Sequence, residues 1–251
     1  MSKFRRIPAM MLMFVAVLMV GVLGCVPVSD GECSALQAEL DRANAELDKL
    51  KAELEGVKAE VATIKTASLE ELLQQRRSIR EYIDAPLTQD EVMKLLWAGQ
   101  GITSARGFRT APSAGALYPL EIYLVAGNVD NLAPGIYKYN PVKNDLTLVK
   151  EGDARASLAT ASLGQKSVAA GAIDIVIAAV YERTQIKYGP RGERYVHIEV
   201  GHAAQNICLQ ATALGLGLVT IGAFDDAAVA KIVGVSSDEA PLYVMPVGRI
   251  K

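Results

Sequence analysis

Apolar residues between Leu36 and Ile64 recur at alternating spacings of four and three residues. The seam consists of Leu36, Leu40, Ala43, Leu47, Leu50, Leu54, Val57, Val61 and Ile64. An average period of about 3.5 residues is that of the buried a and d positions of a coiled coil, in which helices wind around one another. The pattern therefore predicts one long helix that pairs with a second copy of the chain.

The charges beside this seam predict the direction of the pairing. Glutamates occupy one flank at Glu39, Glu46, Glu53 and Glu60, and lysines occupy the other flank at Lys51, Lys58 and Lys65. A parallel pair of helices sets glutamate against lysine, whereas an antiparallel pair sets like charges together. Each exposed pair contributes only ~0.5 kcal/mol, so the charges select the orientation more than they stabilise it. The alternative is a single solvated helix that packs on its own domain.

The first residues have the pattern of an export signal. Three basic side chains precede an apolar run over residues 7–23, which leads to Gly24 and Cys25. A positive region, an apolar region and small residues before a cleavage site are typical of signal peptides. The ending resembles a bacterial lipobox, so we expect Cys25 to carry a lipid anchor on a lipoprotein of the cell envelope, outside the cytoplasm. The alternative is an uncleaved membrane anchor, for which the apolar run is short.

From Ser68 onward the pattern changes to that of a globular α+β domain. Thr88 and Glu91 form a capping box, and the apolar residues that follow predict a helix ending near Gly99. A further helix is predicted over residues 195–214. Strands are predicted over 120–126, 135–139, 146–149, 173–180, 218–221 and 242–245. The chain thus divides into a signal (1–24), a coiled-coil spacer (25–67) and a domain (68–251).

Composition excludes several functional classes. A net charge of −2 gives no basic surface for nucleic acid. The three cysteines lie far apart, which excludes a CxxC metal motif. His197 and His202 are five residues apart and so lie on different faces of a helix, unlike the histidines of a zinc protease. We therefore expect no metal centre.

A cluster of arginines follows the first apolar helix of the domain. Within five residues the chain carries Arg76, Arg77, Ser78 and Arg80. Guanidinium groups match the oxygens of a phosphate monoester, and a serine hydroxyl adds a neutral hydrogen bond. The cluster predicts a phosphate site, although runs of charge are also typical of solvated surfaces. No dinucleotide-binding or P-loop glycine pattern accompanies it.

Several short motifs occur in a recognisable order along the domain. They are residues 76–80, 111–119, 187–189, 191–192, 194–195, 201–206, 215–217 and 221–224. With them, residues 68–251 resemble the FMN-dependent nitroreductase family, and within it the SagB-type branch of dehydrogenases that oxidise thiazoline and oxazoline rings. The resemblance implies a nitroreductase-like mixed sheet flanked by helices, in a homodimer that holds FMN at the subunit interface.

The resemblance also implies roles for particular residues. It assigns the phosphate and ribityl chain to Arg76, Arg77, Ser78 and Arg80, with Arg249 closing on the same phosphate. It assigns contact with the flavin ring of the other subunit to Pro112, Ser113 and Ala114. The backbone at Ile221 and Gly222 matches the segment that donates to flavin N5, where a fixed dipole steadies changes of charge. Arg109 is a further candidate, for the charge that develops near N1.

Lys187 and Tyr188 match the adjacent base and proton relay proposed for the azole-forming branch. Removal of a ring proton while N5 takes a hydride needs such a base. The alternative is that residues 187–190 form an exposed turn.

The other motifs also have purely structural alternatives. Residues 112–119 can be a plain turn, Gly215 and Gly217 can simply end a helix, and His202 can be a core histidine.

These features together predict a membrane-tethered FMN-dependent oxidoreductase that transfers hydride through flavin N5. NAD(P)H is the expected electron donor, and the expected substrate is a small molecule or a peptide. Family members usually draw on cytoplasmic NAD(P)H, which is scarce outside the cell. The alternative is therefore a non-catalytic envelope lipoprotein, in which the spacer presents a flavin-binding or interaction domain.

Overall fold

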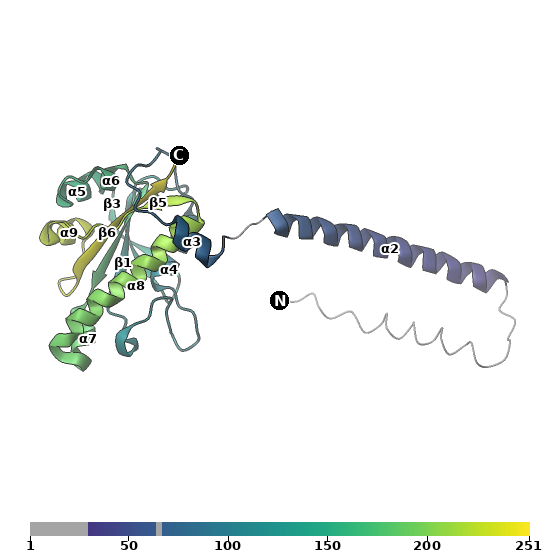
Figure 1. Cartoon of the computed structure of the whole chain (residues 1–251), viewed down its shortest axis with the longest axis horizontal. Helices are drawn as coiled ribbons and strands as arrows, with labels where there is room; N and C mark the ends of the chain where they lie inside the picture. Colours follow the sequence, from purple (N-terminus) through teal and green to yellow (C-terminus); the bar gives the residue numbers. More distant parts are fainter. Residues whose placement is uncertain (1–29, 64–66) are drawn as a thin grey trace. The chain divides into compact units, whose positions relative to one another are not determined.

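The computed structural model describes residues 30–63 and 67–251, which belong to two compact units, 1–65 and 66–251. In the first unit a single helix, α2 (Asp30–Thr63), runs through the segment of the leucine seam (Figure 1). Its seam leucines are about half exposed in the single chain, as at Leu40 and Leu50. The predicted helix is therefore present, whereas its pairing with a second copy stays a prediction.

The predicted signal and Cys25 lie outside the described residues. Among the helices that the structure describes, none combines the length and the apolar character needed to cross a bilayer.

The second unit alternates short helices with the strands of one sheet. Its helices are α3 (Leu69–Gln75), α4 (Gln89–Gln100), η1 (Ala114–Ala116), α5 (Arg155–Ala161), α6 (Lys166–Ala170), α7 (Tyr181–Tyr188), η2 (Gly189–Arg191), α8 (Gly192–Ala213) and α9 (Asp226–Val233). Its strands are β1 (Leu120–Ala126), β2 (Gly135–Asn140), β3 (Asp145–Glu151), β4 (Ile173–Ala179), β5 (Leu216–Leu218) and β6 (Ala240–Arg249).

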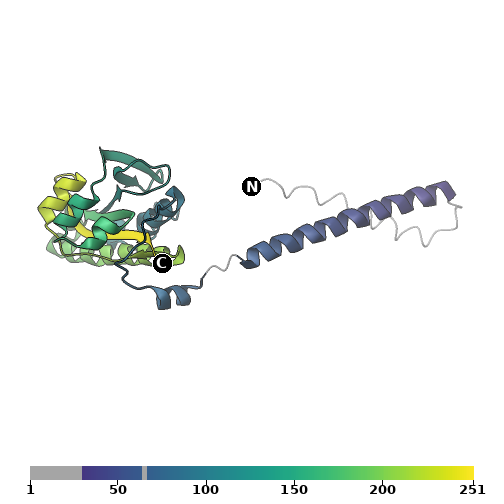
Figure 2. The same cartoon turned by 90° about the horizontal axis from the view of Figure 1, so that it is seen from above.

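The six strands form one sheet in the order β3-β2-β1-β4-β6-β5. Neighbouring strands run antiparallel throughout. Parallel pairing occurs only at isolated bridges of the described chain, one of which joins Ser78 to Leu218. Helices cover both faces, with α4 and α8 on one side and α5, α6 and α9 on the other (Figures 1 and 2). The α+β class, with one sheet flanked by helices on both faces, is confirmed.

One predicted strand is wrong in its extent. The pattern predicted a strand over 218–221, but β5 ends at Leu218 and only Ile221 returns to bridge Val244. Leu218 pairs with Val247, so the antiparallel register sets Val219 opposite Pro246. Proline has no backbone N–H to donate, and the ladder breaks at that point. The backbone of residues 219–220 is thereby released from the sheet.

The central strand β4 contains a buried acid, Asp174, among apolar residues. Asp174 is fully buried, and neither of its carboxylate oxygens has a hydrogen-bond partner in the part of the chain described. Burial raises the pKa of this carboxyl well above its usual range. The folded state therefore binds a proton at Asp174 more tightly than the unfolded chain does.

This linkage predicts that Asp174→Asn stabilises the domain at neutral pH. The pKa of Asp174 is raised in the folded state, so this carboxyl costs the domain no stability below its unfolded pKa of about 4. Its cost to folding grows as the pH rises above that value. The variant should be more stable than the original protein at pH 7, and this gain should shrink almost to nothing at pH 4. Urea unfolding can be followed through Trp97, the single tryptophan of the chain.

Asp153→Asn is the matched control. Asp153 pairs with Arg155 at 2.7 Å, and this pairing holds its pKa below the usual value. Because the pKa of Asp153 is lowered in the folded state, its charged form stabilises the domain. The Asp153→Asn variant should therefore lose a little stability at pH 7, the opposite of the effect expected at Asp174. A destabilised Asp174→Asn protein at that pH would contradict the assignment of Asp174 as a costly buried acid.

Candidate functional site

A hollow of about 160 Å³ lies where the arginine cluster meets α8 and the backbone released after β5. Arg76 and Ser78 line one side of it. The other sides are lined by Gly201, Ala204, Gln205, Cys208, Leu218, Val219, Thr220 and Tyr243. The structure thus brings two members of the predicted phosphate cluster to one concave surface.

Local structure explains why Arg76 and Ser78 lie there. A capping box at Ser68 begins α3, and the helix ends where the N–H of Arg76 donates to Leu72. The chain then runs extended along β5, with the Ile79 N–H donating to the Leu218 carbonyl at 2.9 Å. A Cβ at Gly217 would lie 2.8 Å from Cγ2 of Ile79, so only glycine allows this close approach.

The other predicted phosphate ligands lie differently. The Arg77 guanidinium donates to the carbonyls of Gln74 and Arg76 at 2.8 Å each, and so it caps its own helix. Arg80 is exposed. Neither side chain lines the hollow.

Arg249 is held away from the hollow by another partner. Its guanidinium contacts both carboxylate oxygens of Glu91 at 2.8 and 3.1 Å and donates to the Pro86 carbonyl at 2.9 Å. Glu91 is the acid of the capping box that begins α4. The structure therefore gives Arg249 a structural ion pair, and we leave it out of the phosphate site.

The segment predicted to face flavin N5 continues directly from the rim of the hollow. Thr220 lines the hollow, Ile221 is buried and bridges Val244, and Gly222 is exposed. The bridge fixes the path of the backbone at Ile221. Gly222 follows at the surface, two residues after Thr220 of the hollow.

A second group forms where the loop of residues 112–119 meets the end of α7. Gly115 has a φ of +65°, and a Cβ there would lie 2.9 Å from the Tyr188 hydroxyl and 3.0 Å from Lys187 Nζ. The predicted catalytic pair and the predicted flavin loop, far apart in sequence, are therefore in contact. Ala114 and Ser113 flank this glycine and are half-buried, whereas Pro112 is exposed.

Lys187 and Tyr188 end a helix instead of forming a turn. They are the last residues of α7, and η2 leads from them into α8. The Tyr188 ring packs edge-on against Tyr195 with centroids 5.0 Å apart, and Lys187 Nζ lies 5.4 Å from the Tyr188 ring. Lys187 is exposed in the single chain, and Tyr188 is half-buried.

Arg109 packs against Tyr118 of the same loop. Its guanidinium donates to Oε1 of Gln100 at 2.6 Å and lies 4.6 Å from the centre of the Tyr118 ring. Burial lowers the pKa of this guanidinium. Arg109 is not among the residues that line the Arg76 hollow.

Glu199 of α8, which interacts with Ser113 and Arg109, was not predicted from the sequence as a site residue. It is 2% exposed, and its Oε1 has no hydrogen-bond partner among the described residues. Burial raises its pKa to about 7, although a hydrogen bond from Ser113 and the charge of Arg109 act in the opposite direction. The sequence did contain a signal for this burial. At helical spacing, Glu199 lies on the same buried face of α8 as Val196, Val200 and Ala203.

The two groups lie at different places along α8. The Arg76 hollow meets α8 from Gly201 to Cys208, whereas the Lys187 group meets it near Tyr195. Ten residues separate Tyr195 from Gln205, which is about 15 Å along a helix. Figure 1 shows α3 at one end of α8 and α7 at the other. One chain thus carries both groups but does not bring them together.

The histidines of α8 contribute to neither group. His197 pairs with the Tyr181 hydroxyl at 2.7 Å, and His202 is exposed, so the reading of His202 as a core residue is wrong. Across the described residues, no three potential metal ligands of the His, Cys, Asp or Glu type gather in one place.

The profile of the nitroreductase family matches residues 73–249, which include both groups. The chain belongs to the nitroreductase family. It is thus a nitroreductase-family oxidoreductase, and the segment matched is almost the whole of the second unit.

Two proteins illustrate what this nitroreductase-family chain is similar to in sequence. A protein of Methanocaldococcus jannaschii named as a nitroreductase is 48% identical over 74% of this chain and 93% of its own length. The microcin B17-processing protein McbC of Escherichia coli is 30% identical over 57% of this chain and 54% of its own length. The chain therefore spans about half the length of McbC.

A solved structure gives the same relationship in three dimensions. A chain of the E. coli microcin synthetase McbBCD complex, with truncated pro-MccB17 bound, superimposes with a TM-score of 0.64 at 26% identity. The match covers 70% of each chain. This nitroreductase-family chain thus shares its fold with a chain of the microcin synthetase complex.

Proposed function

We propose that this protein is an FMN-dependent oxidoreductase of the SagB-type dehydrogenase branch, anchored to a membrane through Cys25 and a parallel coiled coil. The observation that carries the proposal is the hollow in which Arg76 and Ser78 face α8, in a chain of the nitroreductase family. The likeness to McbC favours the dehydrogenase branch.

The residues of the hollow fit a phosphate group. No ion pair joins Arg76 to a carboxylate in the described part of the chain, so its charge is free for a ligand. Ser78 adds a hydroxyl donor, and Thr220 and Gln205 add further polar groups on the opposite walls. A guanidinium with nearby neutral donors is the usual way in which proteins hold a phosphate monoester.

Bound FMN would supply a hydride acceptor at its N5. Oxidation of a thiazoline or oxazoline ring removes one hydride and one proton, so the protein must take up the proton. Lys187 Nζ is the proposed base, and the Tyr188 hydroxyl beside it is the proposed relay to solvent. The backbone N–H at Gly222 is the proposed donor that fixes the orientation of the acceptor.

A homodimer would bring together the Arg76 hollow and the Lys187 group, which lie apart in one chain. The outward face of α8 includes Ile198, which is 51% exposed, and the exposed residues Gly201 and Gln205 of the Arg76 hollow. We propose that a second copy packs on this face and brings its own Lys187 to the Arg76 hollow. The pairing of α2 would hold the two copies together.

The proposed substrate is a peptide that carries an azoline ring, with a small molecule as the alternative. McbC is named for the processing of microcin B17, and the solved complex contains a truncated precursor peptide. NAD(P)H would be the electron donor in the reductive direction that is typical of other family members. In the dehydrogenase direction, oxygen or a quinone would remove the electrons.

The experiment is to incubate the purified full-length protein with a thiazoline-containing peptide in air. Mass spectrometry should show a product lighter by two hydrogen atoms, formed in proportion to the FMN content of the protein. A protein that carries FMN but oxidises no azoline peptide, while NADPH bleaches its flavin, would move the proposal to the reductive direction. A protein without flavin would refute it.

A further inference from the structure

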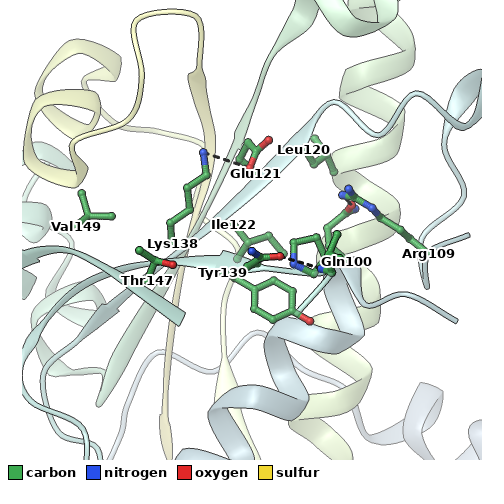
Figure 3. A pocket seen from close by; sticks show the side chains of 12 residues that line it. Gln100, Arg109, Leu120, Glu121, Ile122, Lys138, Tyr139, Thr147 and Val149 are labelled. Carbon is green, nitrogen blue, oxygen red and sulfur yellow. Dashed lines mark hydrogen bonds and ion pairs between the residues drawn. The ribbon is translucent and has the colours of Figure 1, made fainter. Parts of the chain in front are cut away.

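A second cavity, of about 420 Å³, opens between β1, the β2–β3 hairpin and Arg109 (Figure 3). Leu120 and Ile122 of β1 and Val149 of the hairpin form apolar parts of its wall. It shares no lining residue with the Arg76 hollow. Its volume lies within the range of about 300 to 1,000 Å³ that is usual for small-molecule sites.

Two of the cations near this cavity are already neutralised. Lys138 Nζ lies 3.2 Å from Glu121 and 2.7 Å from Glu239, and Arg183 lies 2.6 Å from Glu121. Two cations and two carboxylates thus balance. Figure 3 shows Lys138 directed toward Glu121, along the wall of the cavity. Glu121 therefore presents little net charge to a ligand.

Arg109 is the cation of this cavity that forms no ion pair, although the charges of Glu121 and Glu199 act on it from farther away. Within the described residues no carboxylate lies at ion-pair distance from it, and its direct partner is the neutral Oε1 of Gln100 at 2.6 Å. Arginine has five N–H donors, so most of them remain available. The cavity thus combines apolar wall residues with polar ones, such as Asn140 and Thr147, and with one guanidinium that forms no ion pair.

We propose that this cavity binds a small carboxylate, with the carboxylate on Arg109 and the apolar body of the ligand against β1 and the hairpin. The planar fork of arginine matches a carboxylate with two parallel hydrogen bonds. A dianion would leave one charge unpaired in a cavity with a single free cation, which is costly. The apolar part of the wall, at Leu120, Ile122 and Val149, favours a ligand with an apolar body.

The cavity is joined to the proposed base through one helix. Arg183 of α7 bonds both Glu121 on the cavity wall and the carbonyl of Tyr118, and Lys187 follows one helical turn later. We take this carboxylate ligand to be part of the substrate on which Lys187 acts. That reading rests on the proposed function, whereas the binding itself does not.

The test measures binding without turnover, by calorimetry on the full-length protein. Benzoate, phenylacetate and N-acetylleucine are compared with their neutral amides. At least one carboxylate should bind roughly tenfold or more tightly than its amide, and Arg109→Gln should remove that difference. Arg106→Gln removes the same charge from an exposed position of the same loop and should change nothing.

A second variant keeps the test independent of the fold around Arg109. Val149 is 41% exposed, so Val149→Trp fills the cavity from the hairpin without disturbing the core, and it should abolish binding of acid and amide alike. The proposal is overturned if no carboxylate of the panel binds, or if Arg109→Gln leaves the preference intact. The flavin content of each sample is read from its spectrum, so either failure is separable from a failure of the flavin proposal.

Discussion

Replacement of both Arg76 and Ser78 by alanine is expected to strip FMN from the protein. The two side chains line one wall of the hollow, and no carboxylate of the described chain pairs with Arg76. Hydrogen bonds to a charged phosphate contribute about 1.5 to 3 kcal/mol each, so the double variant should bind FMN roughly 100-fold more weakly or worse. The dissociation constant is measured by quenching of FMN fluorescence on titration with apoprotein.

Arg77→Ala is the matched control for this variant. Its guanidinium donates to main-chain carbonyls at the end of α3 and does not line the hollow. The affinity for FMN should therefore remain within about threefold of the original. If Arg77→Ala released FMN while the double variant kept it, the phosphate would have been assigned to the wrong arginine.

Loss of the Lys187 amine is expected to stop turnover and leave the flavin in place. Lys187→Met and Tyr188→Phe remove the proposed base and relay at the contact with Gly115, which lies away from the Arg76 hollow. General base catalysis usually contributes 100- to 10,000-fold, so Lys187→Met should slow azoline oxidation by roughly that factor. The rate is measured by mass spectrometry at equal FMN occupancy.

Ile186→Ala provides the comparison on the same helix. Ile186 is 88% exposed and precedes Lys187, so its loss disturbs neither the pair nor the core. The oxidation rate should remain within about twofold. An equal loss of rate in the Ile186 and Lys187 variants would point to damage at the end of α7 and away from proton transfer.

Elements with local signals were predictable from the sequence. The capping box of Thr88 and Glu91 fixes the start of α4 because both hydrogen bonds are made within one turn. Strand β1 and the hairpin of β2 and β3 follow from short apolar runs beside a turn. The early end of β5 was not predictable, because it depends on Pro246 lying opposite in a strand that follows later in the chain.

In the candidate site, too, residues in a local motif were predictable, whereas their tertiary partners were not. The motif supplied Arg76, Ser78, Lys187 and Tyr188, but nothing local says that Gly115 packs against the last two. Arg249 is the counterexample, because its position near the C-terminus matched a phosphate ligand while tertiary structure gave it Glu91. Side-chain partners of this kind are set by packing between distant segments, which residue spacing does not encode.

The most direct test of phosphate recognition compares the affinity of the apoprotein for FMN with its affinity for riboflavin. The two ligands share the ring and the ribityl chain and differ in the phosphate alone. If Arg76 and Ser78 hold that phosphate, FMN should bind roughly 100-fold more tightly than riboflavin, and the difference should vanish in the double variant. Equal affinities in the unaltered protein would contradict the account.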